Sequence, residues 1–248
     1  QNLWYYVDPY LQNTSIRDDF NENKILDLDI DKSIEFFFDE LENKTKARRY
    51  TDSDANGSGD SLYDTVYLEE IKNLWEAGTM LFQRNLTTDP RTIYTTINGT
   101  SFLTDNFSTT NKSTLRSYMN VADDTTAEKI INYVHGIDQT GCRSRTVTIG
   151  TTTAPWRLGD IVSSTPKLQA VAPANSYHLT PPDGYLDTTY SDYINTTAYK
   201  TRGMVYAGAN DGMLHAFRLG TLTQSWSGQT TNQKAQLSGT DLGKEEWA

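Results

Sequence analysis

Cysteine is almost absent from this chain. Of its 248 residues only Cys142 is a cysteine, so the sequence supports neither an intrachain disulfide nor a cysteine-ligated metal site. Long apolar runs are also missing, because no stretch approaches the ~18 apolar residues that a membrane-spanning helix needs. The N-terminal stretch QNLWYYVDPY lacks the basic start and apolar core of a secretion signal, which favours a mature protein or a fragment.

Basic residues are scarce as well. The chain has 22 Lys and Arg against 32 Asp and Glu, a formal net charge of -10. Nucleic-acid binders concentrate Lys and Arg on one face to meet the phosphates, so this balance argues against a nucleic-acid partner. Only three histidines occur, namely His135, His178 and His215. None is placed by the sequence beside a serine or Cys142, so no nucleophilic catalytic set is indicated.

The stretch MVYAGANDGMLHAFRLG, residues 204–220, predicts a β-hairpin. Both arms alternate with period two around a turn written N-D-G, which is among the strongest local hairpin signals. Met213, His215 and Phe217 then fall on one face of the second strand. Because His215 shares that face with two large apolar side chains, we expect it to be a buried, hydrogen-bonded structural histidine.

A second hairpin is predicted nearer the N-terminus. SIEFFF, residues 33–38, and TKARRYT, residues 45–51, carry aromatic and β-branched residues on both sides of a polar connection. The consecutive Phe36, Phe37 and Phe38 suggest burial on both faces of this strand.

Two helices are expected in the first half of the chain. Ser61 and Asp64 resemble a capping box, and apolar residues at helical spacing predict a helix over residues 61–84, with Gly78 as its weak point. The second helix, residues 125–135, starts at Thr125 and ends at Gly136.

From residue 143 onward the pattern changes to strands and loops. The polar stretch 173–201 reads as an exposed excursion between two strands, and such loops usually carry binding surface. The final GKEEWA completes a blade repeat of the kind found in quinoprotein-type β-propellers. The predicted fold is therefore mainly β with a few helices and incomplete propeller blades. Residues 1–142 form a mixed segment leading into the propeller, and residues 143–248 form its first blade or blades, as the first part of a larger propeller protein.

The stretch DSDANGSGD, residues 52–60, places oxygen-bearing residues at alternate positions of a loop, with Gly57 where a sharp turn is needed. This is the front of an EF-hand-like loop, whose hard oxygen ligands suit Ca²⁺. Position 12 departs from that pattern, because Tyr63 stands where a bidentate glutamate is usual. The predicted calcium ligands are Asp52, Asp54, Asn56, Ser58 through its carbonyl, and Asp60. The alternative is a flexible acidic hairpin loop. DLDID, residues 27–31, lacks the turn glycine and is not expected to be a site.

Three segments together resemble the PilY/PilC family, the tip-associated adhesins of bacterial type IV pili. They are WRLGDIVSSTPKLQAV, GMVYAGANDGMLHAF and GKEEWA, and upstream pieces such as LWEAGTMLFQRN extend the similarity over most of residues 74–248. The resemblance implies a bacterial cell-surface protein with a calcium-dependent propeller. It also implies a role in pilus assembly, retraction control and adhesion, with a type IV pilin or minor pilins and a host or surface receptor as partners.

Two other functions remain open on the sequence. A quinoprotein dehydrogenase has similar blade turns, but enzymes of that family often carry a vicinal disulfide against the quinone, and this chain has one cysteine. A purely structural propeller scaffold would differ from an adhesin by having no partner for its long loops. We therefore expect a non-enzymatic surface protein.

Overall fold

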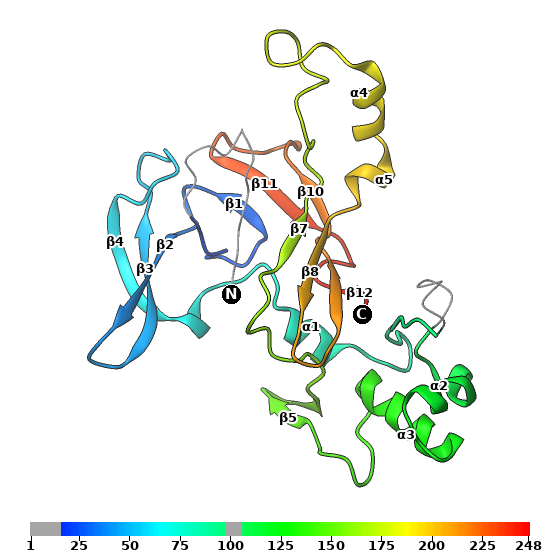
Figure 1. The fold of residues 1–248 in the computed structure, drawn as a ribbon. Helices are drawn as coiled ribbons and strands as arrows, with labels where there is room; N and C mark the ends of the chain where they lie inside the picture. The colour runs from blue at the N-terminus through cyan, green and yellow to red at the C-terminus, as the bar shows by residue number, and fades with distance from the viewer. Residues whose placement is uncertain (1–15, 98–105) are drawn as a thin grey trace. The chain divides into compact units, whose positions relative to one another are not determined.

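The computed structural model describes residues 16–97 and 106–248, which are mainly β-strands in small antiparallel sheets with few helices (Figure 1). This confirms the mainly β expectation. None of the sheets in the described residues closes on itself. The chain divides into two compact units, and each is built from several separate stretches. Unit 1 takes residues up to 75, Ala170–Arg202 and Gly220–Leu242, and unit 2 takes Glu76–Gln169, Gly203–Leu219 and Gly243–Ala248.

Unit 1 contains two three-stranded sheets. One has the order β2-β3-β4 and the other the order β1-β11-β10. Its elements are β1 (Ile25–Asp27), β2 (Ser33–Asp39), β3 (Lys44–Thr51), β4 (Ser61–Tyr67), the 3-10 helix η2 (Leu68–Glu70), α4 (Thr188–Ile194), α5 (Thr197–Lys200), β10 (Thr221–Thr223) and β11 (Gln233–Ser238).

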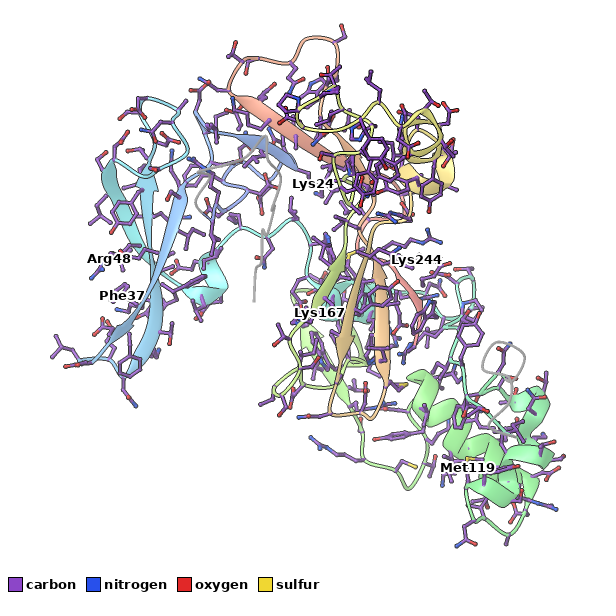
Figure 2. All side chains as sticks on the ribbon, turned by 45° about the horizontal axis from the view of Figure 1, so that its top comes forward. Lys24, Phe37, Arg48, Met119, Lys167 and Lys244 are labelled. Atoms are coloured by element: carbon purple, nitrogen blue, oxygen red, sulfur yellow. The ribbon has the colours of Figure 1, made fainter. Side chains whose placement is uncertain are left out.

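The hairpin predicted at residues 33–51 is present as β2 and β3, and β4 adds a third strand. A buried cluster lies where Ile34, Ala47 and Val66 share one face. The expectation that all three phenylalanines are buried is wrong, because Phe36 and Phe38 are exposed beyond this cluster. Phe37, on the other face, lies with its ring centroid 4.0 Å from the guanidinium of Arg48 (Figure 2).

The helix predicted over residues 61–84 is wrong for most of its length. Residues 61–67 form strand β4, because SLYDTVY contains two tyrosines and the β-branched Thr65 and Val66, and β3 supplies its backbone partners. Asp64 does not cap a helix but pairs with Arg49 at 2.7 Å. A helix begins only at α1 (Ala77–Gln83), where the carboxylate of Glu76 accepts the Gly78 and Thr79 N–H groups.

Unit 2 is organised around a four-stranded sheet of order β12-β9-β8-β7. Its elements are α1, the 3-10 helix η3 (Thr109–Asn111), α2 (Lys112–Tyr118), α3 (Asp124–His135), β5 (Thr146–Ile149), β6 (Thr152–Pro155), β7 (Lys167–Gln169), β8 (Met204–Gly208), β9 (Leu214–Arg218) and β12 (Glu245–Trp247).

The N-D-G hairpin forms as predicted, from β8 and β9. Its turn is closed by the Ala209 N–H, which donates to the Met213 carbonyl at 3.0 Å, and Gly212 takes a φ of 83°. His215 and Phe217 lie on one face of β9, and their rings stack with centroids 5.9 Å apart. Both side chains are buried, so this strand supplies the centre of unit 2.

The second predicted helix is confirmed as α3, although its N-cap is Asp123 rather than Thr125. The Asp123 carboxylate accepts the Thr126 N–H at 2.7 Å. Gly136 ends the helix in the left-handed conformation, with a φ of 101°. Among the described residues, no helix has the length and apolar content needed to cross a bilayer.

The excursion predicted between two strands lies between β7 and β8, and many of its side chains are exposed. It is more ordered than a plain loop, because it contains α4 and α5 (yellow in Figure 1). Asp187 caps α4 by accepting the Tyr190 N–H at 2.9 Å, and Thr196 caps α5 by accepting the Tyr199 N–H at 3.2 Å.

Candidate functional site

The acidic loop 52–60 connects β3 to β4, so it closes a hairpin and does not lead into a helix. Asp60 N–H donates to the Thr51 carbonyl at 2.7 Å, which continues the strand ladder into the base of the loop. Ala55 and Gly57 both have positive φ, at 53° and 96°. The sharp turn expected at Gly57 is therefore present, at the position where an EF-hand loop needs it.

Asp52 is the buried end of this loop. One carboxylate oxygen accepts the Asn56 N–H at 3.0 Å and the other accepts the Gly57 N–H at 2.9 Å. The same carboxylate forms an ion pair with Arg17, and both side chains are almost completely buried. The backbone of the loop is thus wrapped around a fixed negative charge.

Asp54 and Asp60 are exposed and lie on the same side as the Asp52 carboxylate. One ligand oxygen from each of these three aspartates lies within 4.8 Å of the other two. Asp60 accepts both the N–H and the hydroxyl of Ser53 at 2.7 Å, and these bonds lower the pKa of the Asp60 carboxyl. Asp60 therefore stays ionised, and the three carboxylates converge at a spacing that suits one hard cation.

The two remaining predicted ligands are occupied within the loop. Asn56 donates its side-chain N–H to Asp54 at 2.8 Å, and its amide oxygen accepts the Ser58 N–H at 2.9 Å. The carbonyl of Ser58 has no hydrogen bond within the described residues. All five predicted residues thus lie in one loop, and three of them are brought together directly.

A second loop, residues 19–27, has the same geometry and was not singled out from the sequence. Asp19 accepts the N–H groups of Asn23 and Lys24 as Asp52 accepts those of Asn56 and Gly57. Glu22 and Lys24 have positive φ, at 58° and 60°, at the positions of Ala55 and Gly57. The shared spacing D-x-[ND]-x-N could have revealed it. Within the described residues, however, only the carboxylates of the 52–60 loop converge.

The neighbouring aspartates of DLDID are structural. Asp31 accepts the Phe20 and Asp27 N–H groups at 3.1 and 2.9 Å, and Asp27 accepts the Asp29 N–H at 3.0 Å. Burial raises the pKa of the Asp31 carboxyl to about 7. These carboxylates hold the turn before β2 together.

A buried charge network in unit 2 surrounds His215. Its Nδ1 lies 2.7 Å from a carboxylate oxygen of Glu245, and its Nε2 lies 3.0 Å from a carboxylate oxygen of Asp211. Arg91 donates two hydrogen bonds to Glu245, at 2.7 and 2.9 Å, and Arg84 donates to the Glu245 carbonyl at 2.8 Å. The network connects the hairpin turn, β9 and β12. It makes His215 the buried, hydrogen-bonded residue that the sequence predicted.

The hydrogen bonds and charges of this network shift the pKa values of its members. Burial by itself would lower the pKa of His215, but hydrogen bonds to Asp211 and Glu245 outweigh it and raise that pKa above its ordinary value. For Glu245 and Asp211, burial would raise the pKa, but contacts that include the bond to His215 outweigh it in both and lower the pKa, and Glu245 is also lowered by its bonds to Arg91. The two carboxylates therefore favour the protonated form of the histidine.

These shifts predict a pH dependence of the stability of unit 2. The contribution of His215 is complete below its ordinary pKa of about 6.5 and is lost as the pH rises through the raised folded value. The contributions of Asp211 and Glu245 are present above about pH 4 and are lost as the pH falls through their lowered values. We expect the contribution of this network to the stability of unit 2 to peak between about pH 4 and 6.5, and urea midpoints measured from about pH 3 to pH 9 test this.

The variant His215→Gln should flatten the alkaline side of this profile, whereas His178→Gln in unit 1 should retain the wild-type slope. Parallel loss of stability in wild type and His215→Gln above about pH 6.5 would contradict the assignment.

The other histidines and the cysteine have different surroundings. His135 Nε2 lies 2.6 Å from the Phe107 carbonyl oxygen, and burial lowers the pKa of His135. The His178 ring lies 5.7 Å from that of Tyr190. Cys142 is a free, half-buried thiol.

Comparison of this chain with family models, with curated proteins and with solved structures finds no match.

Proposed function

We propose that this chain is a non-enzymatic, extracellular component of the bacterial type IV pilus machinery, a calcium-binding propeller scaffold that acts in pilus biogenesis, retraction control and adhesion. The supporting observation is that the three segments carrying the PilY/PilC resemblance come together in one sheet. Residues 156–171 contain β7, residues 203–217 contain most of β8 and β9, and residues 243–248 contain β12. These strands are the complete sheet β12-β9-β8-β7.

The order of strands in this sheet favours a propeller blade. Four antiparallel strands follow one another in chain order, as in a blade, once β10 and β11 are set aside. Those two strands pair with each other, and β11 also pairs with β1 in unit 1, so the insertion between β9 and β12 leaves the sheet intact. The His215 network then ties the turn of the β8–β9 hairpin to β12.

The acidic loop supports the calcium part of the proposal. All of its candidate metal ligands are hard oxygens, and three of its carboxylates converge. Within the described residues, Asp52 is paired with Arg17, whereas neither Asp54 nor Asp60 forms a salt bridge with a Lys or Arg side chain. In the proposed site Asp52, Asp54, Asn56, Ser58 and Asp60 hold Ca²⁺. Three ionised carboxylates in so small a volume repel one another, so a divalent cation stabilises the loop. Because no glutamate follows at position 12, we expect a Kd of about 10⁻⁴ to 10⁻³ M.

Calcium titration tests this site. At calcium concentrations about ten times the Kd, binding should add about 1.4 kcal/mol to the free energy of unfolding, seen as a rise in Tm. Asp54→Ala should abolish the calorimetric signal, because Asp54 is an exposed ligand whose removal leaves the buried Asp52 in place. The matched control is Glu40→Ala, an exposed carboxylate at the neighbouring hairpin turn. Equal calcium heats from wild type and Asp54→Ala would contradict the assignment.

A cellular assay tests the function as a whole. Deletion of the gene in the source bacterium should reduce surface pili and adhesion, and the wild-type gene should restore both. Unchanged piliation would contradict the proposal. Reduction of an artificial electron acceptor by the purified protein, dependent on added pyrroloquinoline quinone, would favour a quinoprotein dehydrogenase instead. If the deletion reduces piliation but leaves adhesion of the remaining piliated cells unchanged, a purely structural scaffold is favoured.

A further inference from the structure

A compact loop in the excursion between β7 and β8, residues 176–187, is here called the tyrosine loop. Its backbone is tied across its own base, because Leu186 N–H donates to the Leu179 carbonyl and Asp187 N–H to the Tyr177 carbonyl, both at 3.0 Å. Compact surface loops of this kind, closed by their own contacts, are frequently functional.

The two sides of the loop approach each other closely at Gly184. A Cβ at this position would lie 2.2 Å from the Ser176 carbonyl oxygen, so only glycine fits. Ser176 also donates its hydroxyl to the Asp183 carbonyl at 2.6 Å. Tyr190 of α4 packs against the loop, since its ring lies 5.9 Å from that of Tyr177 and its hydroxyl accepts the Ala174 N–H at 2.9 Å. The tyrosine loop is therefore preorganised.

The outer surface of the loop presents large side chains to solvent. Tyr177, Tyr185 and Leu186 are 46%, 60% and 56% exposed. The rings of Tyr177 and Tyr185 lie 5.2 Å apart and form a small aromatic platform. Leu186 has a φ of 60°, a left-handed conformation that is strained for a leucine. Rigid tyrosines give large contact area at a low entropy cost, which is why they dominate recognition loops.

The charged residues in the stretch that carries this platform are all acidic. Asp183 and Asp187 belong to the loop and Asp192 to α4, whereas no Lys or Arg occurs between Lys167 and Lys200. Asp187 lies beside the platform, with a carboxylate oxygen 3.4 Å from the Tyr185 hydroxyl. A second copy of this chain, at a net charge of -10, would be repelled. The complementary occupant is a cationic one.

We propose that the tyrosine loop docks a cationic protein segment, with a Lys or Arg side chain over the rings of Tyr177 and Tyr185 and paired with Asp183 or Asp187. Cation–π contact and charge pairing act together in this arrangement. The inference deepens the adhesion part of the proposed function and rests on it for its biological role only.

The test uses a random 12-residue peptide library displayed on phage and selected on the purified chain. Enriched peptides should carry Lys or Arg next to apolar residues, and raising the salt concentration should weaken their binding. Tyr177→Ser combined with Tyr185→Ser should weaken the binding of a resynthesised peptide about tenfold or more. Asp187→Asn, which keeps an N-cap for α4, should weaken it and reduce its salt dependence.

The matched control is Tyr118→Ser, which removes a tyrosine that is 61% exposed on α2 in unit 2. Its peptide affinity should equal that of wild type, and circular dichroism and Tm should be unchanged in all variants. Enrichment without basic residues, equal loss in Tyr118→Ser, or a glycan bound through Tyr185 would each overturn the proposal. So would failure to enrich any peptide, and none of these outcomes touches the piliation assay that tests the proposed function.

Discussion

Replacement of Glu245 by alanine is expected to lower the free energy of unfolding by about 3–5 kcal/mol. Its carboxylate is fully buried, accepts two hydrogen bonds from Arg91 and lies against the His215 ring nitrogen. The truncation leaves Arg91 as a buried charge without its carboxylate, which is the costly outcome for a buried ion pair. For a chain of this length the loss corresponds to a fall in Tm of about 10 °C.

The adjacent Glu246 is the matched control for this experiment. It also belongs to β12 and also binds an arginine, since Arg218 donates to it at 2.8 and 2.9 Å, but both side chains are partly exposed. Exposed ion pairs contribute about 0–1 kcal/mol. Glu246→Ala should therefore change Tm by only a few degrees. If both variants melt at the same temperature, the network does not hold β12 in the sheet.

Local signals in the sequence were enough to predict several elements. The N-D-G turn specifies the β8–β9 hairpin, because Gly212 adopts the positive φ that the turn requires. Gly136 likewise specifies the end of α3. In both cases a few neighbouring residues determine the backbone, so no knowledge of distant contacts is needed. The loop geometry at Gly57 was predictable for the same reason.

The strand β4 was not predictable from spacing alone. Tyr67 and Ile71 stand four residues apart, as on one face of a helix. Tyr67 nevertheless ends strand β4, and Ile71, after the 3-10 helix η2, joins the buried cluster that contains Val66. The strand exists because β3 offers backbone partners along β4, with one register shift between Arg49 and Tyr50, and because Arg49 on β3 binds Asp64. Pairing with such a strand is a tertiary interaction, and here it outweighs the helical spacing of the apolar residues.

The buried charges were the least predictable part of the structure. Arg91 and Glu245 are 154 residues apart in the chain, and no local pattern links them. The same is true of Arg17 and Asp52, which are 35 residues apart. The sequence identified Asp52 as one of a set of alternating oxygens but gave no sign of an arginine beside it. That arginine changes how the loop should respond to calcium.

Replacement of Arg17 by methionine is expected to destabilise the chain strongly in the presence of a chelator, by about 3–5 kcal/mol. Arg17 also donates to the Asp31 carbonyl at 2.9 Å, so its loss leaves both that oxygen and the buried Asp52 carboxylate short of a partner. In the proposed calcium site, Ca²⁺ then supplies the missing positive charge. Removal of the competing guanidinium should also tighten calcium binding, because the ion no longer approaches a neighbouring cation.

The diagnostic measurement is the rise in Tm on adding calcium, compared between wild type and Arg17→Met. A larger rise in the variant follows from linkage, since tighter binding to the folded state adds more stability at the same calcium concentration. The control is Arg48→Met, which breaks an exposed pair with Glu35 in the same sheet and should change neither stability nor the calcium response appreciably. A calcium-dependent rise in the Tm of Arg17→Met that is equal to or smaller than that of wild type would contradict the prediction that Ca²⁺ takes over the role of the Arg17 charge beside Asp52.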